Sequence, residues 1–176
     1  MNGPEQARDA ANRLFELYGD GVYQFIRFSL SNPVEAEDIA QDVFLEAFRS
    51  WNSFRGGSSE KTWLWSIARH RIQDRIRQRG REGASAELDL DSLADSVSPD
   101  PDTLLDLERS LQHLSLDQRQ VFTLRVIQDK PAAEVASILG WSNVKVRVTL
   151  HRALKALESL LQAEPLIEGE GGYRGR

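Results

Sequence analysis

The side chains of this chain that are best suited to chemistry are arginines and tryptophans, concentrated in residues 62–81. Trp63 and Trp65 stand at the start of this stretch, directly after a Gly-Gly-Ser-Ser run. Apolar residues recur behind them at helical spacing, and the arginines between these are opposed inside the stretch only by Asp74: Arg69, Arg71, Arg75, Arg77, Arg79 and Arg81. Because guanidinium groups bind phosphates and indole rings stack on bases, the stretch predicts a cationic helix that binds nucleic acid. The alternative, a solvated arginine face on an ordinary helix, stays open at this point.

Enzymatic chemistry is not indicated anywhere in the sequence. The chain has no cysteine, and its three histidines are scattered: His70, His113 and His151. No paired carboxylate–histidine set, phosphate-binding loop or nucleophile motif is present. We therefore expect no catalytic residue, no metal ligand, no cofactor and no small-molecule substrate, and the protein is not expected to be an enzyme.

Charge is segregated along the chain, although the net charge is only −5. Residues 35–46 carry five acids and no base, residues 61–81 carry seven bases against Asp74, residues 82–108 carry nine acids and no base, and residues 145–155 carry four bases and no acid. Blocks of opposite sign predict several surfaces that meet several different partners.

The bulk composition fits a globular chain of one domain or two small ones. Of the 176 residues, 40% are hydrophobic and 28% are charged. No apolar run is long enough to span a bilayer, and the N-terminus, with Glu5 and Asp9, does not resemble a signal peptide. We expect a protein of a bacterial-type cytoplasm.

The elements that position the basic stretch are expected to be helices. Residues 6–30 show a helical apolar stripe that is interrupted near residues 19–21, and Asn32-Pro33 should end it. Residues 34–52 predict a second helix with one apolar and one acidic face, residues 52–61 a loop, and residues 62–81 the basic helix. Alternating strand patterns are absent, so residues 6–81 are expected to form an all-helical domain.

The second half of the chain predicts another helical domain, residues 104–162. Residues 82–103 are acidic and poor in large apolar groups, so we expect an acidic flexible linker there, and residues 163–176 should be a flexible tail. A helix is expected at residues 103–114, and Ser115 should cap a helix at residues 116–129. The expected fold class is all-α, with two small helical domains.

A helix-turn-helix is expected within this second domain. Pro131 can open a helix over residues 132–139, Gly140 can end it, and Ser142 or Asn143 can cap a last helix that runs to about residue 162. The buried stripe of the last helix would be Val146, Leu150, Ala153 and Leu157. That leaves Asn143, Lys145, Thr149 and Arg152 facing outward with Arg147 and His151 beside them, a set that can meet phosphates and base edges.

Two motifs in series resemble a known family. The first is residues 35–44 (EAEDIAQDVF) with residues 54–59 (FRGGSS) and Thr62-Trp63-Leu64-x-x-Ile67-Ala68-Arg69; the second is Glu134-Val135-Ala136, Leu139-Gly140 and residues 146–153. The first resembles the core-binding and promoter-melting domain of bacterial RNA polymerase sigma factors, of the extracytoplasmic-function class. The second resembles the helix-turn-helix domain of the same class. The resemblance covers most of residues 10–160.

The resemblance implies partners for the charge blocks. The acidic helix would dock on the clamp helices of the polymerase's largest subunit through Asp38, Gln41, Asp42 and Glu46. The loop and basic helix would open the −10 element of promoter DNA through Arg55, Ser58, Lys61, Trp63, Trp65, Arg69, Arg71 and Arg75. The last helix would read the −35 element through Asn143, Lys145, Arg147, Thr149, His151 and Arg152. Its domain would also contact the polymerase flap.

Regulation follows from the resemblance too. The acidic linker would follow the basic RNA-exit path of the polymerase. A separate anti-sigma factor would clamp both domains and could hold the protein near the membrane, and the response would be to stress or environment.

Four positions depart from the family pattern. Glu60 stands where an apolar residue is usual, His70 where asparagine is usual, Lys145 where a small polar residue is common, and Leu154 where arginine is common. These departures are compatible with the fold. They bear on which promoter sequence is read, and together they predict a DNA affinity that is weaker by one phosphate contact.

Two other classes of function compete with the sigma factor as explanations of the sequence. A stand-alone helix-turn-helix regulator would explain residues 103–162 but leaves the acidic helix and the basic stretch without a role. A helical hydrolase lacks any supporting motif. Direction of core polymerase to a specific start site discriminates a sigma factor from both.

Overall fold

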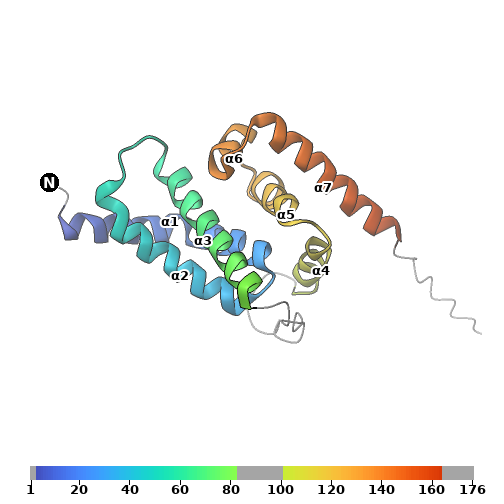
Figure 1. Ribbon diagram of the computed structural model, residues 1–176, viewed down its shortest axis with the longest axis horizontal. Coiled ribbons are helices and arrows are strands. Elements are labelled where there is room, and N and C mark those ends of the chain that lie inside the picture. Colours follow the sequence, from blue (N-terminus) through green and yellow to red (C-terminus); the bar gives the residue numbers. More distant parts are fainter. Residues whose placement is uncertain (1–2, 83–100, 164–176) are drawn as a thin grey trace, which may run out of the picture.

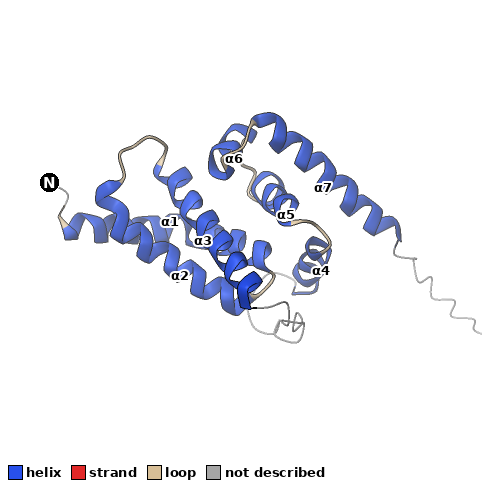
Figure 2. Ribbon diagram, viewed as in Figure 1, coloured by secondary structure: helices blue, strands red, loops and turns tan. Residues whose placement is uncertain are grey.

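The computed structural model of the protein describes residues 3–82 and 101–163, and this part of the chain consists of helices joined by short connections (Figures 1 and 2). It contains no strand within the described residues. The N-terminal half consists of α1 (Pro4–Leu30), α2 (Pro33–Ser50), the single 3₁₀ turn η1 (Trp51–Ser53) and α3 (Glu60–Glu82). The C-terminal half consists of α4 (Pro101–Gln112), α5 (Leu116–Phe122), the π-helical turn η3 (Thr123–Ile127), α6 (Ala132–Leu139) and α7 (Asn143–Ala163). The all-α prediction is confirmed.

Helix α1 is continuous, so the interruption predicted near residues 19–21 is wrong. Its two glycines keep helical geometry, and Gly21 has a packing role. A Cβ atom at Gly21 would lie 3.1 Å from Cζ2 of Trp65 on α3. The absence of a side chain lets the indole ring lie directly against the α1 backbone, which offsets the poor helix propensity of glycine.

The corner between α1 and α2 is built from three residues. Ser31 adopts the left-handed conformation with φ 57°, and its backbone N–H donates to the Arg27 carbonyl. The Asn32 side chain then accepts a 3.2 Å hydrogen bond from the Glu35 backbone N–H, and Pro33 occupies the first turn of α2. Proline lacks the amide hydrogen that the first helical position does not use. The predicted helix end at Asn32-Pro33 agrees with this corner.

The helix caps predicted for the C-terminal half agree closely with the structure. Ser115 caps α5 through a capping box with Gln118, and Gly140 ends α6 with φ 67°. Ser142 rather than Asn143 caps α7, because its Oγ accepts a 3.1 Å hydrogen bond from the Lys145 backbone N–H. The helix predicted over residues 116–129 instead changes to a π turn at Thr123, which lengthens its last turn.

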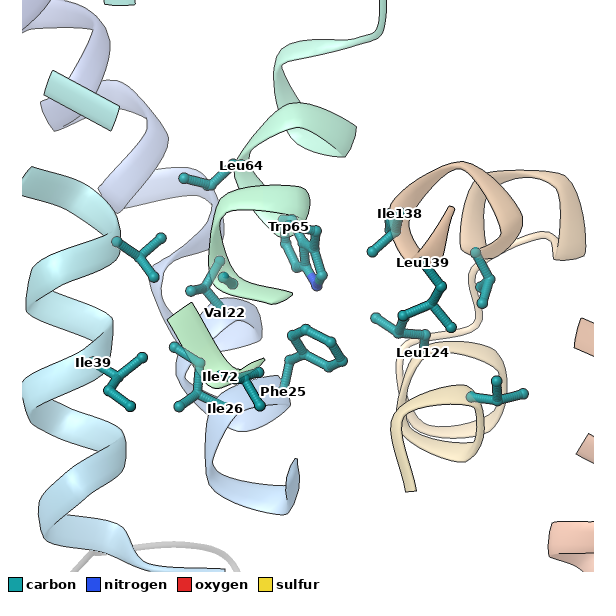
Figure 3. Packing of buried hydrophobic residues seen from close by; sticks show 14 of the residues in the cluster. Val22, Phe25, Ile26, Ile39, Leu64, Trp65, Ile72, Leu124, Ile138 and Leu139 are labelled. Atoms are coloured by element: carbon teal, nitrogen blue, oxygen red, sulfur yellow. The ribbon is translucent and has the colours of Figure 1, made fainter. Parts of the chain in front are cut away.

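One hydrophobic core runs through both halves of the chain (Figure 3). From the N-terminal half it takes buried residues such as Leu14, Phe25, Leu64, Trp65 and Ile72, and from the C-terminal half Val121, Leu124, Val135, Ile138 and Leu139. A smaller cluster joins α1 to α4, α5 and α7 through Phe28, Leu111, Leu114, Phe122 and Ala153. The two helical units are therefore docked on each other.

The predicted linker and tail fall largely outside the described residues. At their edges, Glu82 belongs to α3, residues 101–103 belong to α4 and Ala163 belongs to α7. None of the helices in the described ranges is long and apolar enough to cross a membrane.

Candidate nucleic-acid interface

The predicted DNA-binding residues of α3 do not share one face of the helix. Lys61, Trp65 and Arg69 point toward the C-terminal half. Arg71 and Arg75 pair with carboxylates of α2. Trp63 lies in a third direction, against the loop that precedes α3. Successive residues of a helix are rotated by about 100°, so basic residues that are close together in the sequence point in different directions around the helix. The residues predicted to form one surface therefore lie in three environments.

Trp65 is a core residue, with 2% of its surface exposed. Its ring meets the edge of Tyr18 at a centroid distance of 5.6 Å and lies beside Gly21. On its other side, the Lys130 ammonium is 3.9 Å from the ring centroid. The ring nitrogen of Trp65 is buried and has no hydrogen-bond partner among the described residues. In this arrangement Trp65 cannot meet DNA.

Two acidic residues of α2 form ion pairs with arginines of the basic helix α3. Glu35, with 19% of its side chain exposed, pairs with Arg75 at 2.6 Å and also with Arg79. Glu46 pairs with Arg71 at 3.0 Å. The sequence predicts that Glu46 binds polymerase and that Arg71 and Arg75 bind DNA. In this structure all three are engaged within the N-terminal half.

The remaining predicted polymerase-binding residues are exposed. Asp38, Gln41 and Asp42 lie at i, i+3 and i+4 positions of α2, so they share one side of the helix. Among the described residues, Asp38 and Asp42 form no salt bridge, whereas Glu35 and Glu46 do.

An apolar groove of about 850 Å³ borders this acidic face. It lies between α1 and α2 and is lined by Phe15, Phe44, Leu45 and Phe48, with Gln41 at its edge. Phe15 meets Phe44 edge-on at 5.1 Å and has 61% of its surface exposed. An exposed phenylalanine next to exposed carboxylates is typical of an interaction surface. Phe44 and Phe48 belong to the apolar face expected of the helix at residues 34–52, and the sequence did not reveal this groove.

Three aromatic rings hold the loop before α3, and two of them were missed in the sequence. Trp51 and Phe54 stack at 5.8 Å, and Phe54 and Trp63 approach to 4.8 Å. All three rings remain partly exposed. Trp51 lies at the end of the apolar face expected of the helix at residues 34–52, and Phe54 is the first residue of the loop motif at residues 54–59. The signal was available, because three aromatic residues bracket a glycine-rich loop.

The loop itself presents its polar groups to solvent. Arg55 and Ser58 are exposed, and Gly56 adopts a left-handed conformation with φ 72°. Ser59 starts α3, since its Oγ accepts a 3.1 Å hydrogen bond from the Thr62 backbone N–H. The aromatic residues fix the base of the loop while its tip remains open to a ligand.

The face of α7 agrees only partly with the prediction. Asn143, Lys145, Arg147, His151 and Arg152 are exposed. The prediction that Thr149 faces outward is wrong, because this residue is buried, with 9% of its surface exposed. Its position three residues after Val146 and four before Ala153, both buried, puts it close to the packed stripe.

Lys145 already has partners in this structure. Its ammonium lies 3.7 Å from the centroid of the Trp141 ring and 3.7 Å from the Asp117 carboxylate. Both contacts are at the surface and weak enough to exchange for a phosphate.

Comparison with known proteins identifies both halves. Residues 14–82 match the family model of Sigma-70 region 2, and residues 104–157 match that of Sigma-70, region 4. The chain is 33% identical over 169 residues to the ECF RNA polymerase sigma factor SigX of Bacillus subtilis (strain 168), which covers 89% of this chain and 87% of the relative. It is 30% identical over 171 residues to SigW of the same organism, covering 88% and 90% of the two chains.

A solved structure matches across both halves as well. The sigma factor RpoE, in complex with the anti-sigma factor NepR from Bartonella quintana, superposes with a TM-score of 0.74 at 26% identity, covering 88% of this chain and 98% of that chain. CnrH, at 23% identity and a TM-score of 0.68, supports the same fold.

Two helical units in series, the first carrying an acidic and a basic helix and the second a helix-turn-helix, define a transcription initiation factor of the sigma-70 type. The chain belongs to the extracytoplasmic-function RNA polymerase sigma factors. Proteins of this class direct core RNA polymerase to promoter DNA, so the resemblance of the two motifs is confirmed.

Proposed function

We propose that this protein binds core polymerase through the exposed side of α2. Asp38, Gln41 and Asp42 would meet the clamp helices, with the groove beside Phe15 receiving an apolar side chain. The observation that carries this proposal is that these three polar residues are exposed on one side of α2 while Glu35 is used inside the fold. Glu46 would contribute to polymerase binding only after it gives up its ion pair with Arg71.

Promoter recognition is divided between the two halves in this proposal. The open loop, with Arg55 and Ser58, would receive an unpaired base of the −10 element, and Trp63 would offer a stacking surface next to it. The exposed residues of α7, chiefly Arg147 and Arg152, would contact the −35 element in the major groove. The aromatic residues Trp51 and Phe54 support the role proposed for the loop, because they pack with Trp63 at its base.

The protein would act as an initiation subunit and not as an enzyme. The described residues contain no cluster of three or more His, Cys, Asp or Glu side chains suited to a metal ion. A separate anti-sigma factor is proposed as its regulator, in keeping with the complex in which the similar RpoE was solved. The proposed location is the cytoplasm, the proposed context is a response to stress, and the proposed domain limits are 6–81 and 104–162.

The decisive experiment is transcription in vitro with purified core polymerase and a library of promoter fragments. We expect specific transcript starts only when the protein is added, and mapping those starts would define the −10 and −35 sequences. Tight binding of promoter duplex without polymerase, together with no specific start, would instead support a stand-alone regulator.

A further inference from the structure

The second helix of the helix-turn-helix, α7, carries two exposed valines that packing does not explain. Val144 and Val148 have 70% and 43% of their surfaces exposed, whereas Val146 between them is fully buried. Neither exposed valine belongs to a hydrophobic cluster of the described residues. Valine is also a weak helix former, because its branched side chain loses rotamer freedom in a helix. Neither core packing nor helix propensity therefore accounts for these two residues.

The two valines lie opposite the packed stripe of α7. The buried residues of this helix are Val146, Thr149 and Ala153. Since successive residues are rotated by about 100°, Val144 points almost directly away from these three, and Val148 lies within about 40° of Val144. Residues four apart are neighbours on a helix surface. The valines therefore form one apolar pair on the side of α7 that faces away from α5 and α6, on which the helix packs.

Basic and polar side chains surround this apolar pair. Arg147 and His151 share its outward side, and both are exposed. Lys145 and Arg152 lie on one flank, about 90° around the helix from Val144. Through its first fifteen residues α7 contains four Lys or Arg residues and no Asp or Glu. The surface thus combines an apolar centre with a positively charged rim.

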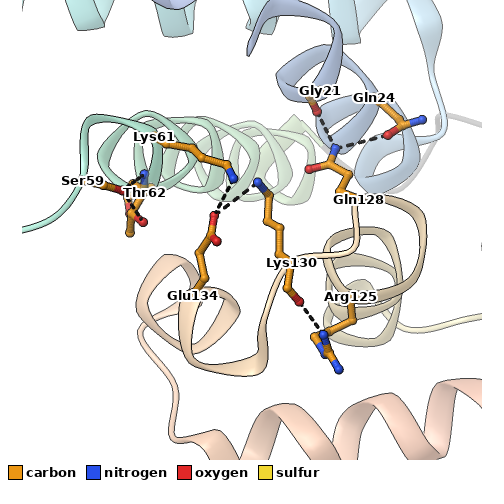
Figure 4. A network of polar contacts seen from close by, with 10 residues as sticks. Gly21, Gln24, Ser59, Lys61, Thr62, Arg125, Gln128, Lys130 and Glu134 are labelled. Carbon is orange, nitrogen blue, oxygen red and sulfur yellow. Dashed lines mark hydrogen bonds and ion pairs between the residues drawn. The ribbon is translucent and has the colours of Figure 1, made fainter. Parts of the chain in front are cut away.

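The arginines of this rim are more available than the basic residues that face α6 from α3. On α3, Lys61 shares the Glu134 carboxylate with Lys130, at 3.3 Å and 3.4 Å (Figure 4). Arg147 and Arg152 of α7 are exposed and form no salt bridge among the described residues. Their charge can therefore meet an anionic partner without breaking a contact inside the protein.

Duplex DNA offers the matching combination of groups. Its backbone is anionic, and thymine exposes in the major groove a C5-methyl group that apolar side chains contact. The N-terminal residues of a recognition helix are those that contact base edges, and both valines lie in the first two turns of α7. Four residues span about 6 Å along a helix axis, which corresponds to one or two base pairs at about 3.4 Å each.

We propose that Val144 and Val148 read the methyl groups of two thymines, one or two base pairs apart, in the −35 element, while Lys145 and Arg152 hold phosphates at the flank. This inference rests on the proposed function and adds the bases that the −35 contact selects. Removing a methyl group would leave the valine surface without an apolar partner, so the contact favours thymine. The −35 residues predicted from the sequence include neither valine, and they include Thr149, which is buried.

Deoxyuridine tests this proposal, because it differs from thymidine only in lacking the methyl group. The transcript starts that the protein directs with core polymerase first define the −35 element, which should contain two thymines one or two base pairs apart, on the same or opposite strands. Each thymine is then replaced by deoxyuridine, and specific transcription is measured at a subsaturating protein concentration. We expect a loss of about fourfold for each methyl group removed, as the burial of one CH₂-sized group predicts.

Val144→Ala and Val148→Ala assign the methyl groups to residues. Each variant should lose the difference between thymine and uracil at one position and keep it at the other, because alanine is too short to reach the methyl group. Circular dichroism should show an intact helix, since alanine has the higher helix propensity. Val126→Ala is the matched control: this valine, on η3, has 47% of its surface exposed, and its variant should keep both differences.

Three results would overturn the inference. Specific starts that do not differ between thymine and uracil templates would exclude methyl contacts, and so would a mapped −35 element without thymine. Valine variants that keep the difference between thymine and uracil but bind core polymerase more weakly would show that this side of α7 docks on protein. The absence of any specific start with the wild-type protein would instead overturn the proposed function, and the inference with it.

Discussion

The ammonium of Lys130 lies 3.9 Å from the centroid of the Trp65 ring, with the lysine in the C-terminal half of the chain and the tryptophan in the N-terminal half. A cation over an indole face is favourable, and more so when both partners are shielded from water. The pair links the helix predicted to open DNA to the segment that precedes the helix-turn-helix. Because burial lowers the pKa of Lys130, we expect the stability of the docked form to depend on pH through this pair.

The first prediction concerns this pH dependence. Burial lowers the pKa of Lys130 from 10.5 to about 8, Glu134 opposes the shift, and Lys61 adds to it. Because the folded-state pKa is below the unfolded value, the unfolded chain binds more protons between pH 8 and 10.5, and folded stability rises across that window. Below pH 8 the cost of charging the buried amine is fully present, up to about 3 kcal/mol.

Lys130→Met removes that cost and provides the reference. We expect the free energy of unfolding of the wild type, measured in urea, to rise relative to the variant between pH 8 and 10. A difference that stays constant with pH would show that Lys130 keeps an ordinary pKa.

The second prediction separates the two tryptophans. Trp65→Ala should destabilise the fold by about 3–5 kcal/mol, as expected for a large buried aromatic side chain. Trp63→Ala should cost less, because its ring is partly exposed and packs beside Phe54 and Trp51 at the edge of the core. The Trp63 variant should instead impair promoter opening, read with a fluorescent base analogue in the −10 element, more than it impairs initial promoter binding. Equal stability losses for the two variants would contradict this division.

The third prediction tests the polymerase-binding face. Reversing the charge of both Asp38 and Asp42 to lysine should abolish binding to core polymerase, because the exposed carboxylates are the complementary charges in the proposed contact. Circular dichroism should stay unchanged, since both positions are exposed. Glu158→Lys, an exposed change on α7, serves as the control in a pull-down with core polymerase. Retained affinity in the double variant would place the contact elsewhere.

The fourth prediction uses two glycines of the same helix. A Cβ at Gly19 would meet the Phe15 ring at 3.5 Å, an ordinary contact, whereas one at Gly21 would lie 3.1 Å from Trp65. Gly19→Ala should therefore stabilise the protein by up to about 1 kcal/mol through helix propensity. Gly21→Ala should lose most or all of that gain, because Tyr18 and Lys130 confine the ring on both sides. Thermal unfolding of the two variants tests the difference, and equal stabilisation would show that the ring is free to move.

Local features of the fold were accessible from the sequence. Pro33, Ser115 and Gly140 each have a chemistry that is tied to a helix end, and all three stand at helix boundaries in the structure. The interruption of the first helix was predicted wrongly, since low helix propensity at Gly21 was weighed without the ring that packs against it. Local propensity can be read from neighbours in sequence, but the contact with Trp65 joins residues 44 positions apart.

Only the outline of the candidate site could be predicted from the sequence. The blocks of acid and base in residues 35–46 and 61–81 could be seen in the sequence, as could the order of the two motifs. The sequence did not reveal that Glu35 and Glu46 are neutralised by arginines of the next helix, or that Trp51 and Phe54 support the loop. Such pairings depend on how α2 and α3 cross, which long-range packing sets.

By itself, then, the sequence determined the helices, their caps, the segregation of charge and the family, because each depends on residues close together in the chain or on a motif in series. Tertiary structure alone decided which side chains of α3 face solvent and which face the helix-turn-helix. The reason is geometric: Lys61, Trp65 and Arg69 lie on the side of α3 that packs on α6, and only the docking of the two halves distinguishes that side from the others.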